Sequence, residues 1–181
     1  MKIVIPPEAE PVTIAELKEQ LRIDHSDEDA LLGAKITAAR RHVENLTGTA
    51  IAPATYEFFL DSFPLAEIEL PRAPVISVST VSYIGADGIE VNATDYEVDT
   101  ASPRGWIVPT AAWPTAMATI NAVRVRFVAG YETAPESLRE ANLHLAAWWY
   151  ENREAASLDG TPRAVPFSVA ELVNEHREWT F

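Results

Sequence analysis

The sequence predicts an α+β fold, a helical bundle of about four helices with a long β-rich insertion between the second and third helices. Three observations predict it. Residues 13–47 and 134–153 repeat apolar side chains every three or four positions, which is the period of a helix packed on a core. Residues 51–132 combine recurrent prolines with runs of β-branched and aromatic residues, which is typical of strands and turns. Helix-start signatures of one kind precede the helical segments.

Each signature has the pattern of a capping box. A hydroxyl at the N-cap accepts from the backbone N–H three residues on, and the acidic residue there accepts from the N–H of the cap. The four occurrences are Thr13–Glu16, Ser26–Asp29, Thr133–Glu136 and Ser168–Glu171. We therefore expect helices over about 13–23, 27–47 and 134–153, and a short last helix from Ser168.

The helix over 27–47 has the clearest apolar face. Its predicted buried residues are Leu32, Ile36, Ala39, Val43 and Leu46. Gly48 follows, where a left-handed residue ends many helices. The opposite face holds Lys35, Arg40, Arg41 and Glu44, and we interpret it as a solvated side, with a partner-facing side as the alternative.

The β-rich block contains runs that suit half-buried strands. These are Tyr56–Leu60, Ile68–Leu70, Val75–Tyr83, Tyr96–Val98, Trp106–Val108 and Val123–Val128. In the last run Arg124 and Arg126 alternate with apolar residues, which predicts one wet face. Asp87-Gly88, between Tyr83-Ile84 and a further short run at Ile89–Val91, predicts a hairpin turn.

The helix over 134–153 is apolar almost all round and ends in Trp148, Trp149 and Tyr150. Such a helix is buried on more than one side. Either it is a central rod for the other elements, or its aromatic end meets a neighbouring subunit. Residues 157–166 are expected to form a link, and the short helix after it ends near Trp179 and Phe181.

Composition bounds the class of protein. The 181 residues are 48% apolar, enough for one folded domain, and the absence of cysteine excludes disulfides and thiolate metal sites. No apolar run reaches the roughly 18 residues that span a bilayer, and the first residues do not form a signal peptide, so we expect a soluble protein with no membrane partner.

The net charge is −13, from 27 acidic and 14 basic residues, and it is spread along the chain. Such a surface repels phosphate, whereas nucleic-acid binding depends on clusters of lysine and arginine. Ordinary DNA binding is therefore not expected. An acidic surface remains compatible with a path that DNA passes through without being held.

Motifs for chemistry are absent from the sequence. The four histidines are not spaced as metalloprotease ligands, and no glycine-rich phosphate loop or nucleophile elbow occurs. The densest carboxylate cluster comprises Asp24, Asp27, Glu28 and Asp29, but it lacks the central glycine of a calcium loop. We interpret it as a charged turn between helices, and we expect no enzyme, metal or cofactor.

Several segments together resemble the head–tail connector (adaptor, or head-completion) proteins of long-tailed double-stranded DNA phages, prophages and gene transfer agents. The resemblance is carried by Glu10–Asp24 (EPVTIAELKEQLRID), Asp27–Leu32 (DEDALL), Ala38–Gly48 (AARRHVENLTG), Val125–Tyr131 (VRFVAGY), Pro135 and Trp148–Glu154 (WWYENRE). These segments follow one another in the family's order over most of the chain. The long block over 51–132 departs from the shortest relatives, which are nearly all helical.

The resemblance implies a homo-oligomeric ring, commonly of twelve copies, that docks under the portal protein and joins the capsid to the next neck protein. It also implies a passive channel for double-stranded DNA, a place in the neck of the virion or particle, and assembly in the bacterial cytoplasm. Within it we expect a connector domain over 1–156, and a linker with a docking helix over 157–181. Another neck or tail-completion protein, and an uncharacterised hydrolase, are the alternatives.

Three groups of residues are expected to serve such a ring. Asp24, Asp27, Glu28 and Asp29 are predicted to line the channel. Trp148, Trp149 and Tyr150 are predicted at the contact between subunits. Phe167, Leu172, Trp179 and Phe181 are predicted to dock on the portal, with folding back onto the bundle, or disorder, as alternatives for this tail.

Overall fold

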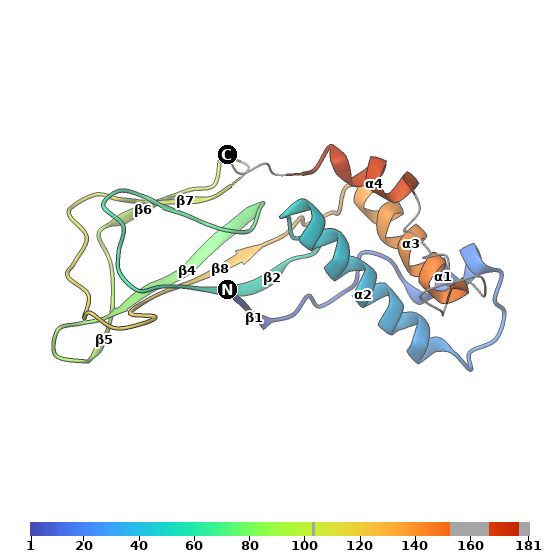
Figure 1. The fold of residues 1–181 in the computed structure, drawn as a ribbon, viewed down its shortest axis with the longest axis horizontal. Coiled ribbons are helices and arrows are strands. Elements are labelled where there is room, and N and C mark those ends of the chain that lie inside the picture. Colours follow the sequence, from blue (N-terminus) through green and yellow to red (C-terminus); the bar gives the residue numbers. More distant parts are fainter. Residues whose placement is uncertain (103, 153–166, 178–181) are drawn as a thin grey trace, which may run out of the picture. The chain divides into compact units, whose positions relative to one another are not determined.

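A computed structural model describes residues 1–102, 104–152 and 167–177 (Figure 1). The chain divides into two compact units. One, the β unit, comprises Met1–Glu8 and Ala52–Glu132, and the other, the helical unit, comprises Ala9–Ile51 and Thr133–Phe181. The predicted mixture of helices with antiparallel sheets is confirmed.

In the helical unit, two of the described helices each contact the other three. The helices are α1 (Ile14–Leu21), α2 (Asp29–Thr47), α3 (Glu136–Glu151) and α4 (Phe167–Asn174). Helix α3 packs against α1, α2 and α4, and α1 and α4 also contact α2. Side chains buried between them include Leu17, Leu32, Ile36, Leu138 and Leu145. Burial of these apolar side chains is the main stabilising term for the unit.

The capping predictions hold at one helix only. Thr13 and Glu16 form a complete capping box on α1. The N-cap of α2 is Glu28 and that of α3 is Pro135, and neither makes a side-chain cap bond. Ser26 instead accepts the Asp29 N–H through its backbone carbonyl, and Pro135, with a φ of −54°, takes the N-cap position that was predicted for Thr133. Ser168 lies inside α4.

At the carboxyl end of α2 the prediction holds. Gly48 has a φ of 77°, in the left-handed region, and its N–H donates to the Glu44 carbonyl. Leu46, however, is exposed, whereas Arg40, Glu44 and Thr47 are buried. Two of the four residues predicted on the solvated face, Arg40 and Glu44, are thus buried, because polar partners described below cover them, whereas Arg41 is exposed and Lys35 half-buried.

The β unit contains a five-stranded antiparallel sheet in the order β1-β2-β8-β4-β5. Its strands are β1 (Lys2–Ile5), β2 (Ala54–Leu60), β4 (Val75–Ile84), β5 (Glu90–Asn92) and β8 (Val123–Ala129). A three-stranded antiparallel sheet has the order β3-β7-β6, from β3 (Ile68–Glu69), β6 (Tyr96–Asp99) and β7 (Trp106–Pro109). The sequence predicted all of these except β1. The predicted hairpin joins β4 and β5, with Gly88 at a φ of 80°.

The core of the β unit lies on one face of the larger sheet. Val123, Val125 and Phe127 of β8 are buried there, as predicted, and Tyr56 of β2 stacks on Phe127. The smaller sheet approaches this sheet closely at Gly105, where an added Cβ would stand 2.6 Å from the Val75 Cγ2. Glycine is required there by contact rather than by φ.

The other face of the larger sheet carries charged side chains that form ion pairs with one another. Arg126 pairs with Glu57 at 2.6 Å, Lys2 pairs with the same carboxylate at 2.9 Å, and Arg124 pairs with Glu90. The face predicted to be wet is therefore covered in part by its own ion pairs, and Glu57 is almost fully buried beneath them. Arg126 and Lys2 hold the pKa of Glu57 below its usual range.

Candidate assembly surfaces

The predicted acidic cluster lies around the beginning of α2 and divides into two pairs. Asp24 and Asp27 are exposed. Glu28 and Asp29 are half-buried and have partners in the same unit, since Glu28 accepts a hydrogen bond from the Tyr150 hydroxyl and Asp29 pairs with Lys18. Only the first pair therefore offers carboxylates fully to solvent. Within the described residues, no group of three or more acidic or histidine side chains could hold a metal ion.

The three aromatic residues at the end of α3 are half-buried, and two of them have side-chain contacts in their own unit. Trp149 meets His42 of α2 edge-on, with ring centroids 5.6 Å apart. Tyr150 reaches Glu28 at the beginning of α2. These contacts support the interpretation of α3 as a central rod, and they leave Trp148 as the aromatic residue beside an open hollow.

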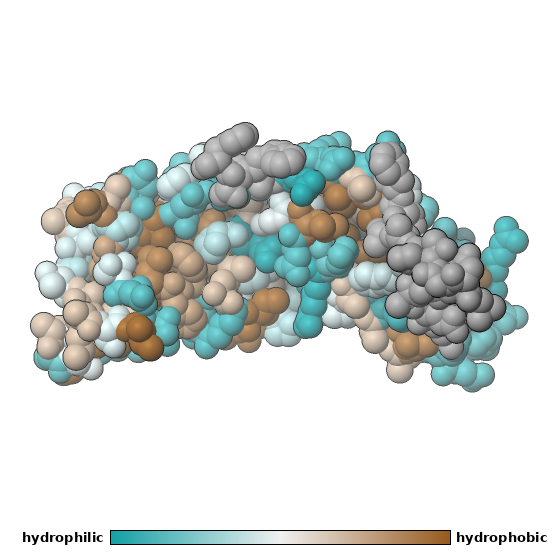
Figure 2. All heavy atoms as spheres, viewed as in Figure 1, coloured by the Kyte–Doolittle hydropathy of each residue, from teal (hydrophilic) through white to brown (hydrophobic). Residues whose placement is uncertain are grey.

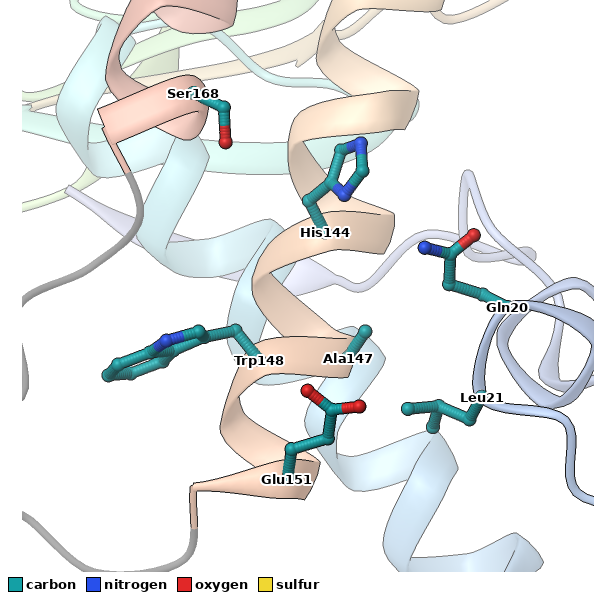
Figure 3. Close-up of a pocket in the computed structure, with 7 residues that line it drawn as sticks. All are labelled: Gln20, Leu21, His144, Ala147, Trp148, Glu151 and Ser168. Carbon is teal, nitrogen blue, oxygen red and sulfur yellow. The ribbon is translucent and has the colours of Figure 1, made fainter.

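That hollow has a volume of about 180 Å³ and lies between α1, α3 and α4 (Figure 3). Its walls are formed by Gln20, Leu21, His144, Ala147, Trp148, Glu151 and Ser168. It is smaller than the roughly 300–1,000 Å³ of ligand pockets, but a single side chain of another protein fits that scale. A second hollow, of about 390 Å³, lies between residues 9–14 and α2.

Helix α4, which the sequence assigned to docking, packs on its own unit. Val169 and Val173 are buried, and the Ser137 hydroxyl lies 2.6 Å from the His176 Nε2. This is the fold-back alternative for the helix itself. Leu172 is half-buried, while the Phe167 side chain, Trp179 and Phe181 lie outside the described residues.

Arg40 and Glu44, on the side of α2 that was predicted to be solvated, form a hydrogen-bonded polar network that the sequence did not predict. Arg40 donates to Glu10 at 2.7 Å through Nε and to Glu44 at 2.9 Å through Nη1. The second Glu44 oxygen accepts from the Ile51 N–H at 3.0 Å. Burial lowers the pKa of Arg40, but the two carboxylates outweigh it and raise that pKa. The i, i+4 spacing of Arg40 and Glu44 was visible in the sequence. The hydrogen bond between Arg40 and Glu10 was not.

One further electrostatic feature joins α1 to α3. The Glu16 carboxylate accepts from the Thr13 N–H at 2.7 Å and from Arg139 at 2.7 Å. These bonds lower the pKa of Glu16 from 4.5 to about 2, with the Thr13 backbone bond as the largest cause and Arg139 next. The capping box therefore also holds a contact between two helices.

At one end of the β unit, three loops carry apolar side chains into solvent. The strands β2 and β4 end, and β8 begins, at the same end of the sheet. The loops there are tied together by the Asn121 N–H on Asp61, by Trp113 on the Ala66 carbonyl and by stacking of Phe63 on Trp113. Leu65, Ile89, Met117 and Ile120 are exposed. Hydrophobic residues are visible among hydrophilic ones on the drawn face (Figure 2).

In the described part of the chain, no helix combines the length and the apolar character needed to cross a bilayer.

Solved structures contain chains of the same fold. A chain in the virion of a native gene transfer agent (GTA) particle has 26% identity and a TM-score of 0.83, and the match covers 99% of this chain and 96% of that one. A chain in the neck of the empty GTA particle, computed with C6 symmetry, has 27% identity and a TM-score of 0.79, with 99% and 96% covered. A chain in the neck of the native GTA particle, computed with C12 symmetry, has 25% identity and a TM-score of 0.75, with 100% and 97% covered.

Both units are therefore similar to those of chains found in gene transfer agent particles. The family model of the head completion protein matches residues 10–176, and the chain belongs to that family. The search of curated proteins found no match. The resemblance stated from the sequence is confirmed.

Proposed function

We propose that this chain is a structural protein of the neck of a phage-like particle, where copies of it form a ring. The observation that carries the proposal is the end-to-end match to neck chains, which includes both the helical and the β unit. The symmetry of those neck structures supports a ring of copies around one axis. In this proposal the chain acts through contacts and not as an enzyme.

In finer detail, we assign the chain the adaptor position, beneath the portal protein and above the next neck protein. The helices then form a bundle in the wall of the ring, and residues 52–132 of the β unit are an insertion between α2 and α3, while β1 comes from before α1. The chain sequence order supports this, because residues 52–132 of the β unit interrupt the helical unit once. Assembly of the ring takes place in the bacterial cytoplasm before heads and tails join.

The channel side of the proposal depends on charge. With a net charge of −13, the protein offers few phosphate-binding positions to DNA in transit. Asp24 and Asp27 are the members of the predicted acidic cluster that are exposed in the chain, so they are our candidates for the lumen. Glu28 and Asp29 contribute to the same field but are also needed for contacts within the unit.

Deletion of the gene, with and without complementation, tests the neck assignment. We expect cells that lack the gene to accumulate DNA-containing heads and free tails that do not join. Complementation should restore complete particles. Normal joined particles in the deletion strain would contradict the proposal. Binding of the purified chain to tails rather than to filled heads would favour the alternative, a tail-completion protein.

Portal docking by the end of the chain is tested by the double variant Trp179→Ala/Phe181→Ala. It removes both aromatic anchors and leaves the buried α4 residues Val169 and Val173 in place. We expect the folded variant to lose attachment to heads that carry the portal, because aromatic side chains supply much of the binding free energy at interfaces. The matched control, Thr180→Ala, should attach normally. Attachment of the double variant at the level of the control would refute docking by these residues.

A further inference from the structure

The five-stranded sheet of the β unit has two open edges among the described residues, formed by β1 and β5. Every residue of both strands is exposed. Strand β1 presents Ile3, Val4 and Ile5, and the β5 edge presents Val91 together with Ile89 just before it. An exposed edge with apolar side chains is a template for another strand, since its outward N–H and C=O groups have no strand partner.

Of the usual protections of an edge, β1 has a register irregularity between Ile3 and Ile5 and one lysine. A lysine on an edge strand normally opposes pairing with another chain. The Lys2 ammonium, however, is engaged with Glu57 at 2.9 Å and lies 5.3 Å from the centre of the Phe59 ring. Both partners belong to β2, so this charge is held over the face of the sheet. The proline that follows, Pro6, lies beyond the strand.

The two edges differ in charge. Lys2 is the charged residue of β1, whereas residues 85–95, which contain β5, carry Asp87, Glu90 and Asp95 and no basic residue. Two β5 edges brought together would place acidic side chains side by side, which is unfavourable, whereas β1 carries no acidic residue to repel them. A contact between two different edges of one sheet is head-to-tail. Repeated around an axis, a head-to-tail contact closes into a ring.

We propose that β1 of one copy pairs with β5 of the next copy, so that the five-stranded sheets of neighbouring subunits continue one another around the ring. This inference rests on the proposed function, because it names the contact that closes the neck ring. The occupant of each edge is a second copy of the chain. The match to a neck structure computed with C12 symmetry fits a head-to-tail arrangement, since all its copies are related by rotation about one axis.

The absence of cysteine from the chain allows a direct test. The double variant Val4→Cys/Val91→Cys places one thiol on each edge at positions that are already exposed. Particles assembled with this variant are treated with a short bifunctional maleimide, whose reach tolerates a register shift of one residue, about 3.3 Å. The Ile3→Cys/Ile89→Cys variant repeats the test at a second pair of positions.

If β1 meets β5, a double variant gives a ladder of covalent oligomers that extends beyond the dimer, and each single-cysteine variant stays monomeric. The matched control, Val4→Cys/Ile76→Cys, carries its second thiol at a similarly exposed position of β4, at the end of that strand that does not pair with β5, and should give no ladder. Dimers from Val4→Cys alone would show that β1 meets β1 and would overturn the proposal.

The remaining outcomes separate the two proposals. If the chains are present in the necks of the particles and neither double variant is cross-linked, edge pairing is wrong while the proposed function stands. If the wild-type chain is absent from the particles, the proposed function fails and the edge contact with it.

Discussion

The Arg40 guanidinium and the Glu44 carboxylate form an ion pair of 2.9 Å one turn apart on α2, with both side chains buried. Arg40 also holds Glu10, which precedes α1, and Glu44 also holds the Ile51 backbone, which follows α2. Two residues of one helix thereby fix the segments that enter and leave the helical unit. The network is polar, yet Arg40 and Glu44 occupy buried positions where apolar side chains would be usual.

Arg40→Met is expected to destabilise the helical unit strongly. The variant keeps most of the side-chain volume but leaves Glu44 buried without its cation, and loss of one partner of a buried pair costs about 3–5 kcal/mol. The control is Arg41→Met, at the exposed neighbouring position, where the change should stay within about 0.5 kcal/mol. Urea unfolding followed by circular dichroism measures both. Equal unfolding midpoints for the two variants would contradict the role given to Arg40.

Two glycines should respond to alanine in opposite directions. At Gly130 the φ is 138°, and an added Cβ would stand 2.5 Å from the Ala52 carbonyl, so Gly130→Ala should destabilise the β unit by more than about 1 kcal/mol. At Gly33, inside α2, the nearest atom to a new Cβ is the Ile14 Cδ1 at 3.6 Å. Gly33→Ala should therefore stabilise by about 0.5–1 kcal/mol. Thermal unfolding compares the two, and a stabilised Gly130→Ala would be inconsistent with the structure.

Acid sensitivity should be traceable to Glu16. Its pKa is about 2 in the folded protein against an ordinary value of 4.5, so the folded state releases this proton more readily than the unfolded state. The stabilisation is complete above pH 4.5 and is lost as the pH falls toward 2. Glu16→Gln keeps a capping box but removes the charge. The stability difference between wild type and variant should therefore shrink as the pH falls through this window.

The control for that experiment is Glu19→Gln, which removes an exposed carboxylate from the same helix. At pH 7 its free energy of unfolding should stay within about 0.5 kcal/mol of that of the wild type. A stability difference between Glu16→Gln and wild type that stays constant from pH 6 to pH 2 would show that the hydrogen bonds to Thr13 and Arg139 do not lower the pKa of Glu16.

Asn142 offers a stabilising substitution. It lies fully buried on α3, and neither atom of its carboxamide has a hydrogen-bond partner among the residues described. A buried polar group without a partner costs about 1–3 kcal/mol. Asn142→Leu, similar in size, should raise the free energy of unfolding by about 1 kcal/mol, whereas Asn45→Leu on the exposed side of α2 should change it little. Destabilisation by Asn142→Leu would reveal a partner for this side chain.

The parts of the fold that depend on local sequence were predictable. Helical periodicity located α1, α2 and α3, the alternation of Val123, Val125 and Phe127 located β8, and Asp87-Gly88 located the β4–β5 hairpin. Gly48 marked the end of α2 correctly, because a left-handed residue there is a local requirement.

The parts that depend on distant partners were not predictable. Arg40 was expected to be exposed to solvent. No pattern in the neighbouring sequence indicated that Glu10, thirty positions earlier, would bind and cover it. Strand β1 was missed for the same reason, since it forms by pairing with β2, far along the chain. Ser26 and Thr133 matched a cap pattern, but neither is an N-cap. Ser26 accepts the Asp29 N–H through its backbone carbonyl, and Pro135 is the N-cap of α3.

The proposed surfaces show the same division. The sequence grouped Asp24, Asp27, Glu28 and Asp29 by proximity, and the structure separates the exposed pair from the pair that holds Tyr150 and Lys18. It grouped Trp148, Trp149 and Tyr150 as aromatic, and the structure gives two of them partners on or beside α2. Which groups meet another protein is a property of the assembly, so it stays a prediction.

Electron cryomicroscopy of purified particles that carry this chain tests the central claim most directly. The account predicts density for the chain in a symmetric ring in the neck, between the portal and the tail, with the helical and β units both fitted and DNA or an open channel on the axis. Intact particles whose neck contains no density for the chain, or a chain located in the shell or the tail tip, would contradict it.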